Sequence, residues 1–165
     1  MEFERRLPPA QRPECTEGYE GFFHLTALSG NVEEAQLHYI IRDHDRKKFE
    51  EKTALFHQLA AELNAEFGAG TFEAVTKDSY YNMKEQIQPH MEIVRRAERA
   101  LRRLGVPSKT VPIRGGTDGA RLSFLGLPCP NLCTGGENFH GRYEFIPVED
   151  MAICADMLMR IACGD

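Results

Sequence analysis

Residues 21–50 read GFFHLTALSGNVEEAQLHYIIRDHDRKKFE, and this stretch decides the fold of the first half of the chain. Apolar Phe23 and Leu25 alternate with polar residues, and a second alternating run occupies residues 33–42. Between the two runs, residues 29–31 read Ser-Gly-Asn, which is typical of a tight turn. Period-two alternation on both sides of a turn predicts a β-hairpin with one buried face.

A helix is predicted directly after the hairpin, over residues 45–67. Asp45 is a suitable N-cap, and Gly68 follows the last apolar residue of the pattern. The apolar stripe at helical spacing consists of Phe49, Phe56, Leu59, Leu63 and Phe67. Residues 71–80 are predicted to form a third strand, so that the order of elements is β-β-α-β.

Helices alternate with short strands in the second half, which predicts an α/β layer. Helices are predicted at residues 89–104, 117–124 and 147–162, and strands at residues 109–113 and 127–132. Along the last helix, the residues expected to face inward are Val148, Met151, Ala152, Ala155, Leu158 and Ala162.

The two halves are predicted to be separate domains, with a boundary near residues 82–89 that divides the chain into residues 1–85 and 86–165. Phe3 and Leu7 precede two prolines and are expected to lie in the last turns of a further helix. Because that helix starts without a cap, we expect the chain to be part of a longer polypeptide.

Composition and charge exclude several classes of protein. The chain has 165 residues, of which 27% are charged, and this is an ordinary globular composition. Its net charge of −5 argues against a nucleic-acid binder, because such proteins usually carry a positive net charge. The arginines of residues 95–103 share one helix face, which we interpret as a solvated surface. The sequence contains no apolar run long enough to span a membrane, and a cytoplasmic location is expected.

The cysteines fit reduced thiols, because they are five in number and form no C-x-x-C pair. We expect most of them to be packed inside the protein. They are Cys15, Cys129, Cys133, Cys154 and Cys163.

Residues 114–120 read RGGTDGA and are predicted to form a turn between a strand and a helix. Free N–H groups at a helix start favour an anion, and Arg114 could grip a carboxylate or phosphate with two hydrogen bonds. The alternative is an ordinary turn in which Thr117 caps the helix.

Residues 134–145 read TGGENFHGRYEF and place His140 in a glycine-rich loop after a predicted strand. A histidine in such a loop is suited to be a metal ligand or a proton carrier, or it is a surface residue without a role. In residues 40–46, Asp43 and Asp45 are interpreted as parts of a structural ion pair and a helix cap. His24 and His38 could be neighbours across the hairpin, an arrangement more typical of a polar outer face than of a metal site.

Five segments resemble the peptidase T family, which are cytosolic tripeptide aminopeptidases with two zinc ions. The segments are TEGYEGFFHL (16–25), HYIIRDHDRKKFE (38–50), DSYYNMKE (78–85), PIRGGTDGARLSFLGLPCPN (112–131) and TGGENFHGRYEF (134–145). The similarity runs in order from about residue 3 to residue 162. It covers the C-terminal part of the family's chain, less than half of it.

The resemblance implies a fold and a set of site residues. His140 matches the family's last zinc ligand, and Arg42 matches an arginine that binds an anionic group of the peptide. Arg114, together with the turn at Gly115 and Gly116, lines the same cleft. Asn138 is the remaining substrate-binding candidate implied by the resemblance.

In this interpretation, residues 1–85 are part of a ferredoxin-like lid and dimerisation domain of α+β type. Residues 86–165 are the end of the zinc-exopeptidase α/β domain. The chain is then expected to form a homodimer through its lid and to act on tripeptides.

The family's other zinc ligands and its glutamate general base have no counterpart in this chain. We therefore expect the chain to be catalytically inactive by itself and to need an N-terminal part. The alternative is a non-catalytic module that dimerises through the hairpin edges or binds peptides.

Overall fold

The computed structural model describes residues 2–164, and both alternating runs of the first half form strands. Strands β1 (Phe22–Gly30) and β2 (Ala35–Arg42) pair antiparallel and form a two-stranded sheet. Asn31 closes the turn, because its Oδ1 accepts hydrogen bonds from the N–H groups of Glu33 and Glu34 at 2.8 and 3.0 Å. The predicted hairpin is confirmed.

The helix that follows the hairpin, α2 (Arg46–Phe67), is also confirmed. Asp45 caps it, since its Oδ1 accepts a hydrogen bond from the Lys48 N–H at 3.0 Å. Gly68 ends it with a φ of +110°, a conformation that L side chains rarely adopt, and donates its N–H to the Asn64 carbonyl at 3.0 Å.

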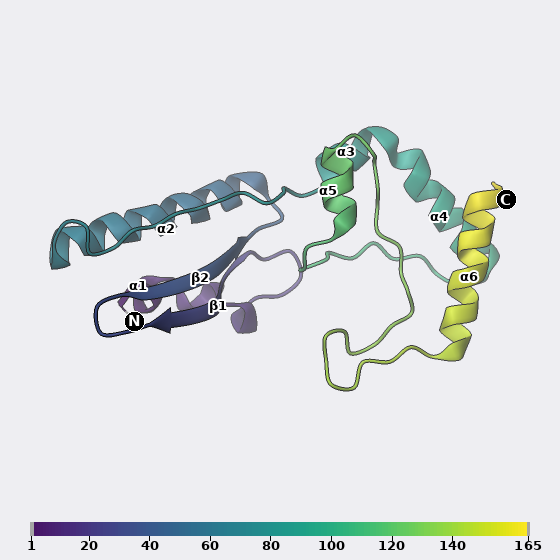
Figure 1. Ribbon diagram of the computed structural model, residues 1–165. Helices are drawn as coiled ribbons and strands as arrows, with labels where there is room; N and C mark the ends of the chain where they lie inside the picture. The colour runs from purple at the N-terminus through teal and green to yellow at the C-terminus, as the bar shows by residue number, and fades with distance from the viewer. Residues whose placement is uncertain (1, 165) are drawn as a thin grey trace. The chain divides into compact units, whose positions relative to one another are not determined.

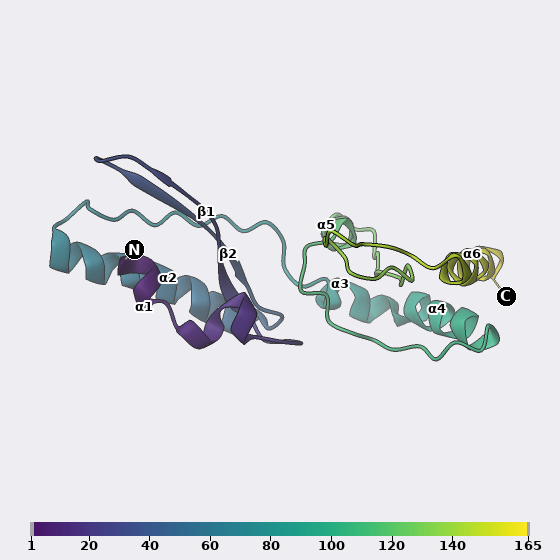
Figure 2. The same ribbon diagram turned by 90° about the horizontal axis from the view of Figure 1, so that it is seen from below.

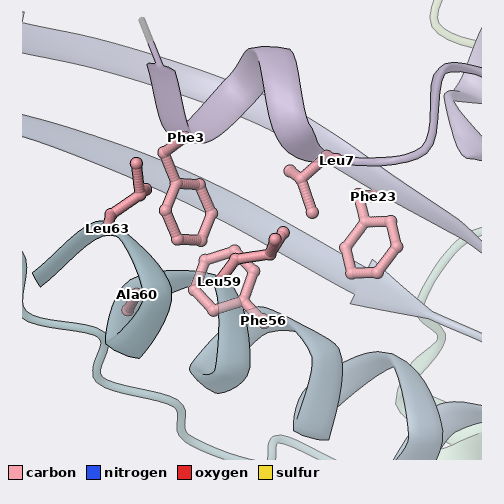
Figure 3. Close-up of a cluster of buried hydrophobic side chains, with 7 residues drawn as sticks. All are labelled: Phe3, Leu7, Phe23, Phe56, Leu59, Ala60 and Leu63. Carbon is pink, nitrogen blue, oxygen red and sulfur yellow. The ribbon is translucent and has the colours of Figure 1, made fainter. Parts of the chain in front are cut away.

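The core of the first unit lies between the hairpin and two helices, α2 and the short α1 (Glu2–Arg6) (Figure 3). Its buried members are Phe3, Leu7, Phe23, Phe56, Leu59, Ala60 and Leu63. Tyr39 and Ile41 of β2 pack against this cluster, so one face of the hairpin is covered, as predicted. Two 3₁₀ turns, η1 (Pro9–Gln11) and η2 (Pro13–Cys15), link α1 to β1.

Two details of the predicted first half are wrong. Phe67, the last residue of α2, is 51% exposed and is not part of the buried stripe. Residues 71–80 are not a strand in the structure. Phe72 and Ala74 do pack against the core, but the Asn64 side chain takes both backbone groups of Phe72, at 2.8 Å from its N–H and 2.7 Å from its carbonyl oxygen. In a β-strand, the backbone of a neighbouring strand would make these two hydrogen bonds instead.

The chain divides into two compact units, the first ending at Asn82 and the second beginning at Met83 (Figure 1). The second unit contains four helices within the described residues: α3 (Lys84–Ile87), α4 (Met91–Arg103), α5 (Asp118–Phe124) and α6 (Val148–Cys163). A 3₁₀ turn, η3 (Gln88–His90), joins the first two. Helices α4 and α6 lie side by side (Figures 1 and 2), and Ala97, Ala100 and Met157 are buried.

The strands predicted at residues 109–113 and 127–132 are wrong, because both segments lack strand structure. Pro112, Pro128 and Pro130 have no N–H to donate to a neighbouring strand. Within residues 2–164 the fold is therefore a mixture of helices and one small antiparallel sheet, and the predicted α/β layer of the second half is not formed.

Helix α6 has its predicted bounds within one residue, but the predicted orientation of its apolar stripe is wrong. The stripe faces outward: all six of its residues are exposed, including Val148 at 76% and Leu158 at 53%. The side that faces inward instead carries Met157, which is 1% exposed, and the half-buried Ile153 and Cys154. An amphipathic pattern predicts that the apolar face of a helix is covered, but it does not identify the polypeptide that covers it.

We predict that Leu63→Ala lowers the free energy of unfolding of the first unit by about 2–5 kcal/mol, because Leu63 is 0% exposed in the core. Urea unfolding followed by circular dichroism measures the change. Leu28→Ala is the matched control, since Leu28 is 56% exposed, and its effect is expected within about 0.5 kcal/mol. Equal losses in the two variants would contradict the location of the core.

Candidate functional site

His140 lies in a loop whose two ends are tied together. Glu137 and Phe145 form an antiparallel bridge, with N–H to carbonyl distances of 2.9 and 3.2 Å. Inside the loop, the Gly141 N–H donates to the Asn138 carbonyl at 2.8 Å, and the Asn138 side chain donates to the Tyr143 carbonyl at 3.3 Å. The loop is thus held by its own backbone and by one amide side chain.

The backbone of this loop is left-handed at two non-glycine residues, Asn138 with φ +56° and His140 with φ +62°. Such residues are uncommon, although Asn and His tolerate the conformation better than most. The His140 N–H donates to a carboxylate oxygen of Glu144 at 3.1 Å, and the residue is exposed. The backbone of His140 is therefore held by a hydrogen bond, and the residue is exposed rather than buried in an apolar interior.

Of the simpler interpretation of the RGGTDGA turn, the Thr117 cap is confirmed, whereas the strand expected before the turn is not formed. Thr117 caps α5, since its Oγ1 accepts hydrogen bonds from the Ala120 N–H at 3.4 Å and the Asn131 side chain at 3.2 Å. Arg114 is half-buried, and Gly115 and Gly116 are exposed.

Two contacts that the sequence did not indicate, made by Ser123 and Gly119, attach α5 to Cys129. The buried Ser123 Oγ donates to the Gly119 carbonyl at 2.7 Å and accepts from the Cys129 N–H at 3.0 Å. A Cβ on Gly119 would lie 2.6 Å from the Cys129 carbonyl oxygen, so this position requires glycine. These contacts hold α5 against the segment that follows it.

Arg42 is half-buried at the end of β2, opposite Phe22. Next to it, Asp43 forms an ion pair with Lys52 of α2 at 3.4 Å, and its side chain is only 3% exposed. Asp43 also accepts a hydrogen bond from the Asp45 N–H at 3.0 Å. The predicted Asp45 cap is confirmed. Asp43 is in an ion pair, as predicted, but its partner is Lys52 of α2, which lies outside residues 40–46.

An open hollow of about 410 Å³ lies beside this ion pair. Its charged lining is mixed, with Lys48 and Lys52 facing Glu20, Glu51 and Asp43. Sequence reasoning missed Lys52, because its contact with the strand end is made across the packing of α2 on the sheet.

The two hairpin histidines are not cross-strand partners. The register places His24 opposite Ile40 and His38 opposite Ala27, so the two histidines do not pair directly across the ladder.

The residues present do not by themselves fit a zinc centre. Over residues 2–164, no group of three or more His, Cys, Asp and Glu side chains is arranged to hold a metal. Zinc sites in proteins take three or four such ligands, so a single imidazole from His140 is one part of a site at most.

The expectation that most cysteines are packed is wrong. Cys15, Cys133 and Cys163 are exposed, while Cys129 and Cys154 are half-buried, and all five are free thiols. Among the helices described, none is long and apolar enough to cross a lipid bilayer.

The chain is similar to proteins named Peptidase T over nearly its whole length. The identity is 52% over 161 residues in Caldanaerobacter subterraneus, 53% over 160 residues in Clostridium novyi and 54% over 161 residues in Parabacteroides distasonis. These alignments cover 97–98% of this chain and 39% of each relative, so the chain spans about two fifths of their length. No protein-family model matches the chain.

Two solved structures share the fold. A tripeptidase from Staphylococcus aureus superposes with a TM-score of 0.69 at 20% identity, covering 97% of this chain and 42% of that one. An aminopeptidase PepT from Bacillus cereus gives a TM-score of 0.60 at 19% identity, covering 96% of this chain and 42% of that one.

We predict that Ser123→Ala lowers the free energy of unfolding of the second unit by about 1–3 kcal/mol, because it leaves the Cys129 N–H without its acceptor. Ser108→Ala is the control at an exposed serine, expected within about 0.5 kcal/mol. Thermal unfolding of both variants measures the difference. A Ser123 variant as stable as the control would show that Ser123 does not hold α5 in place.

Proposed function

Because this chain is a peptidase T homologue along nearly its whole length, we propose that it is the C-terminal portion of a tripeptide aminopeptidase. Such an enzyme releases the N-terminal residue of a tripeptide. The observation that carries the proposal is an identity of 51–54% that extends over about 160 residues and includes both structural units.

The two units correspond, in this proposal, to two parts of the enzyme. Residues 1–85 belong to a ferredoxin-like lid and dimerisation domain, and residues 86–165 belong to the catalytic α/β domain. A helix packed on one face of an antiparallel hairpin supports the first assignment. The cytoplasmic location remains a prediction.

His140 would donate one imidazole nitrogen to a zinc centre whose other ligands precede this chain in the complete enzyme. Two zinc ions there would supply Lewis-acid chemistry for peptide hydrolysis. The exposed position of His140 on a loop tied by hydrogen bonds supports this role. Because the described residues form no zinc centre of their own, the 165-residue chain alone should not hydrolyse peptides.

Substrate binding is assigned to Arg42, Arg114, Gly115, Gly116 and Asn138. A guanidinium group pairs with a carboxylate through two parallel hydrogen bonds, so either arginine is suited to the far carboxylate of a short peptide. The exposed glycines would allow a peptide to approach the backbone closely.

The exposed apolar face of α6 supports the proposal that another polypeptide packs on this helix. Val148, Met151, Leu158 and Met159 are each more than half exposed, although they belong to an amphipathic helix of 16 residues. Large apolar residues gathered on one face indicate a surface that another part covers. We propose that the preceding three fifths of a peptidase T covers it.

A second candidate function is a non-catalytic module that dimerises or binds peptides. It is favoured by the two-stranded sheet, in which each described strand pairs along one side only. Such edges can accept a strand from another chain, and homodimerisation through the lid would use the same feature.

We predict that activity appears when the chain is combined with the N-terminal three fifths of the Clostridium novyi Peptidase T. Tripeptide hydrolysis and bound zinc, measured together, should both rise above those of either piece alone. His140→Ala should lower activity by about a hundredfold or more, while His90→Ala, at an exposed histidine of the same unit, should not. Tripeptide hydrolysis by the 165-residue chain alone would contradict the proposal.

We also predict that Met151→Gln combined with Leu158→Gln weakens binding to that N-terminal piece by about tenfold or more, because two apolar side chains lose their buried environment. Titration calorimetry measures the affinity. Val32→Gln is the control, since Val32 is fully exposed in the hairpin turn. Unchanged affinity in the double variant would place the partner elsewhere.

A further inference from the structure

The segment that leads into the His140 loop packs against one side of α6. Gly135 has φ +75°, and a Cβ there would lie 2.5 Å from the Asp150 Cβ, so the backbone passes directly over that residue. Cys154 lies one turn further along the same side of α6. Its Sγ donates to the carbonyl oxygen of Cys133 at 3.7 Å.

Two independent contacts, Gly135 with Asp150 and Cys133 with Cys154, therefore hold this segment against α6. The second contact joins two cysteines that lie 21 positions apart in the sequence. A disulfide requires the two cysteine backbones to approach closely. The contact of the Cys154 thiol with the backbone of Cys133 makes the two cysteines neighbours in the fold, and the Cys133 thiol is close enough to act on the Cys154 thiol.

We propose that Cys133 and Cys154 are an oxidisable pair whose disulfide ties the start of the His140 loop to α6. The disulfide would close a loop of residues 134–153, which includes the Glu137–Phe145 bridge and His140. Cys133 is exposed and accessible to a small oxidant, whereas Cys154 is half-buried beneath the same segment.

The oxidant is a peroxide, and the reaction has two steps. The Cys133 sulfur attacks one oxygen of hydrogen peroxide, the O–O bond breaks, and a sulfenic acid and one water form. The Cys154 sulfur then attacks the sulfenic sulfur, an S–S bond forms, and the hydroxyl group leaves as a second water. The two thiols lose two electrons and two protons, and the peroxide gains both.

The environment of Cys154 agrees with this order of events. Desolvation by its surroundings, and then the proximity of Cys133, raise the pKa of the Cys154 thiol. Since the thiolate is the reactive form, the raised pKa makes Cys154 the poorer first target for peroxide, which leaves it as the thiol that attacks the sulfenic acid formed on Cys133.

The experiment treats the 165-residue chain at low concentration with hydrogen peroxide, blocks remaining thiols with iodoacetamide, and digests it with trypsin without reduction. Cleavage after Arg121, Arg142 and Arg160 yields one peptide with Cys129 and Cys133 and another with Cys154. We expect these two peptides to be joined in the monomer, and to separate on reduction.

Matched variants identify the cysteine involved. Cys133→Ser should abolish the cross-linked peptide, while Cys129→Ser, which alters the other cysteine of the same peptide, should retain it. In the wild-type chain, oxidation should also slow amide hydrogen exchange in residues 137–145, an effect absent from the Cys133→Ser variant.

A cross-link that survives in the Cys133→Ser variant, or that joins Cys154 to Cys129 or Cys163, would overturn the proposal. So would peroxide treatment that oxidises Cys133 fully without joining it to Cys154, or a bond that forms only between two chains. Because the readout is a mapped bond in the chain itself, it is independent of whether the chain takes part in peptide hydrolysis.

Discussion

The burial of the α2 stripe against one face of the hairpin is the interaction on which the first unit depends. Phe56, Leu59 and Leu63 of α2 share one buried cluster with Phe23 of β1 and Phe3 of α1 (Figure 3). The Phe3 ring packs edge-on against Phe56, with the ring centres 4.6 Å apart. An isolated two-stranded hairpin is marginal in water, so the sheet needs this cover to persist. Everything placed at the end of β2, including Arg42 and the Asp43–Lys52 pair, is positioned by that packing.

The second unit meets the same requirement only in part. Helices α4 and α6 bury Ala97, Ala100 and Met157 between them, but the broad apolar stripe of α6 remains exposed. Extended segments that carry prolines run beside the helices without strand partners within the described residues. This exposed apolar surface agrees with the finding that the chain spans about two fifths of the length of its relatives.

Local hydrogen bonds, more than packing in the core, hold the His140 loop and the turn before α5. The His140 loop is tied by the Glu137–Phe145 bridge and by the Asn138 amide, and it tolerates two left-handed residues. The turn before α5 is held by Thr117 and Ser123. Exposed residues on such loops are where binding and catalytic groups are commonly presented, because loops supply function and the packed elements supply rigidity.

Within the first unit, the sequence by itself determined the hairpin, the Asp45 cap and the middle of the α2 stripe, because period and capping are local properties. In the second unit it predicted three helices with their bounds within about two residues, and it offered Thr117 as the cap of α5. Only the tertiary structure decided that residues 71–80 form no strand, that the α6 stripe faces outward, and that Cys133 meets Cys154. Each of these depends on a partner distant in sequence, and a periodic pattern shows that a face or a strand needs a partner without identifying which segment supplies it.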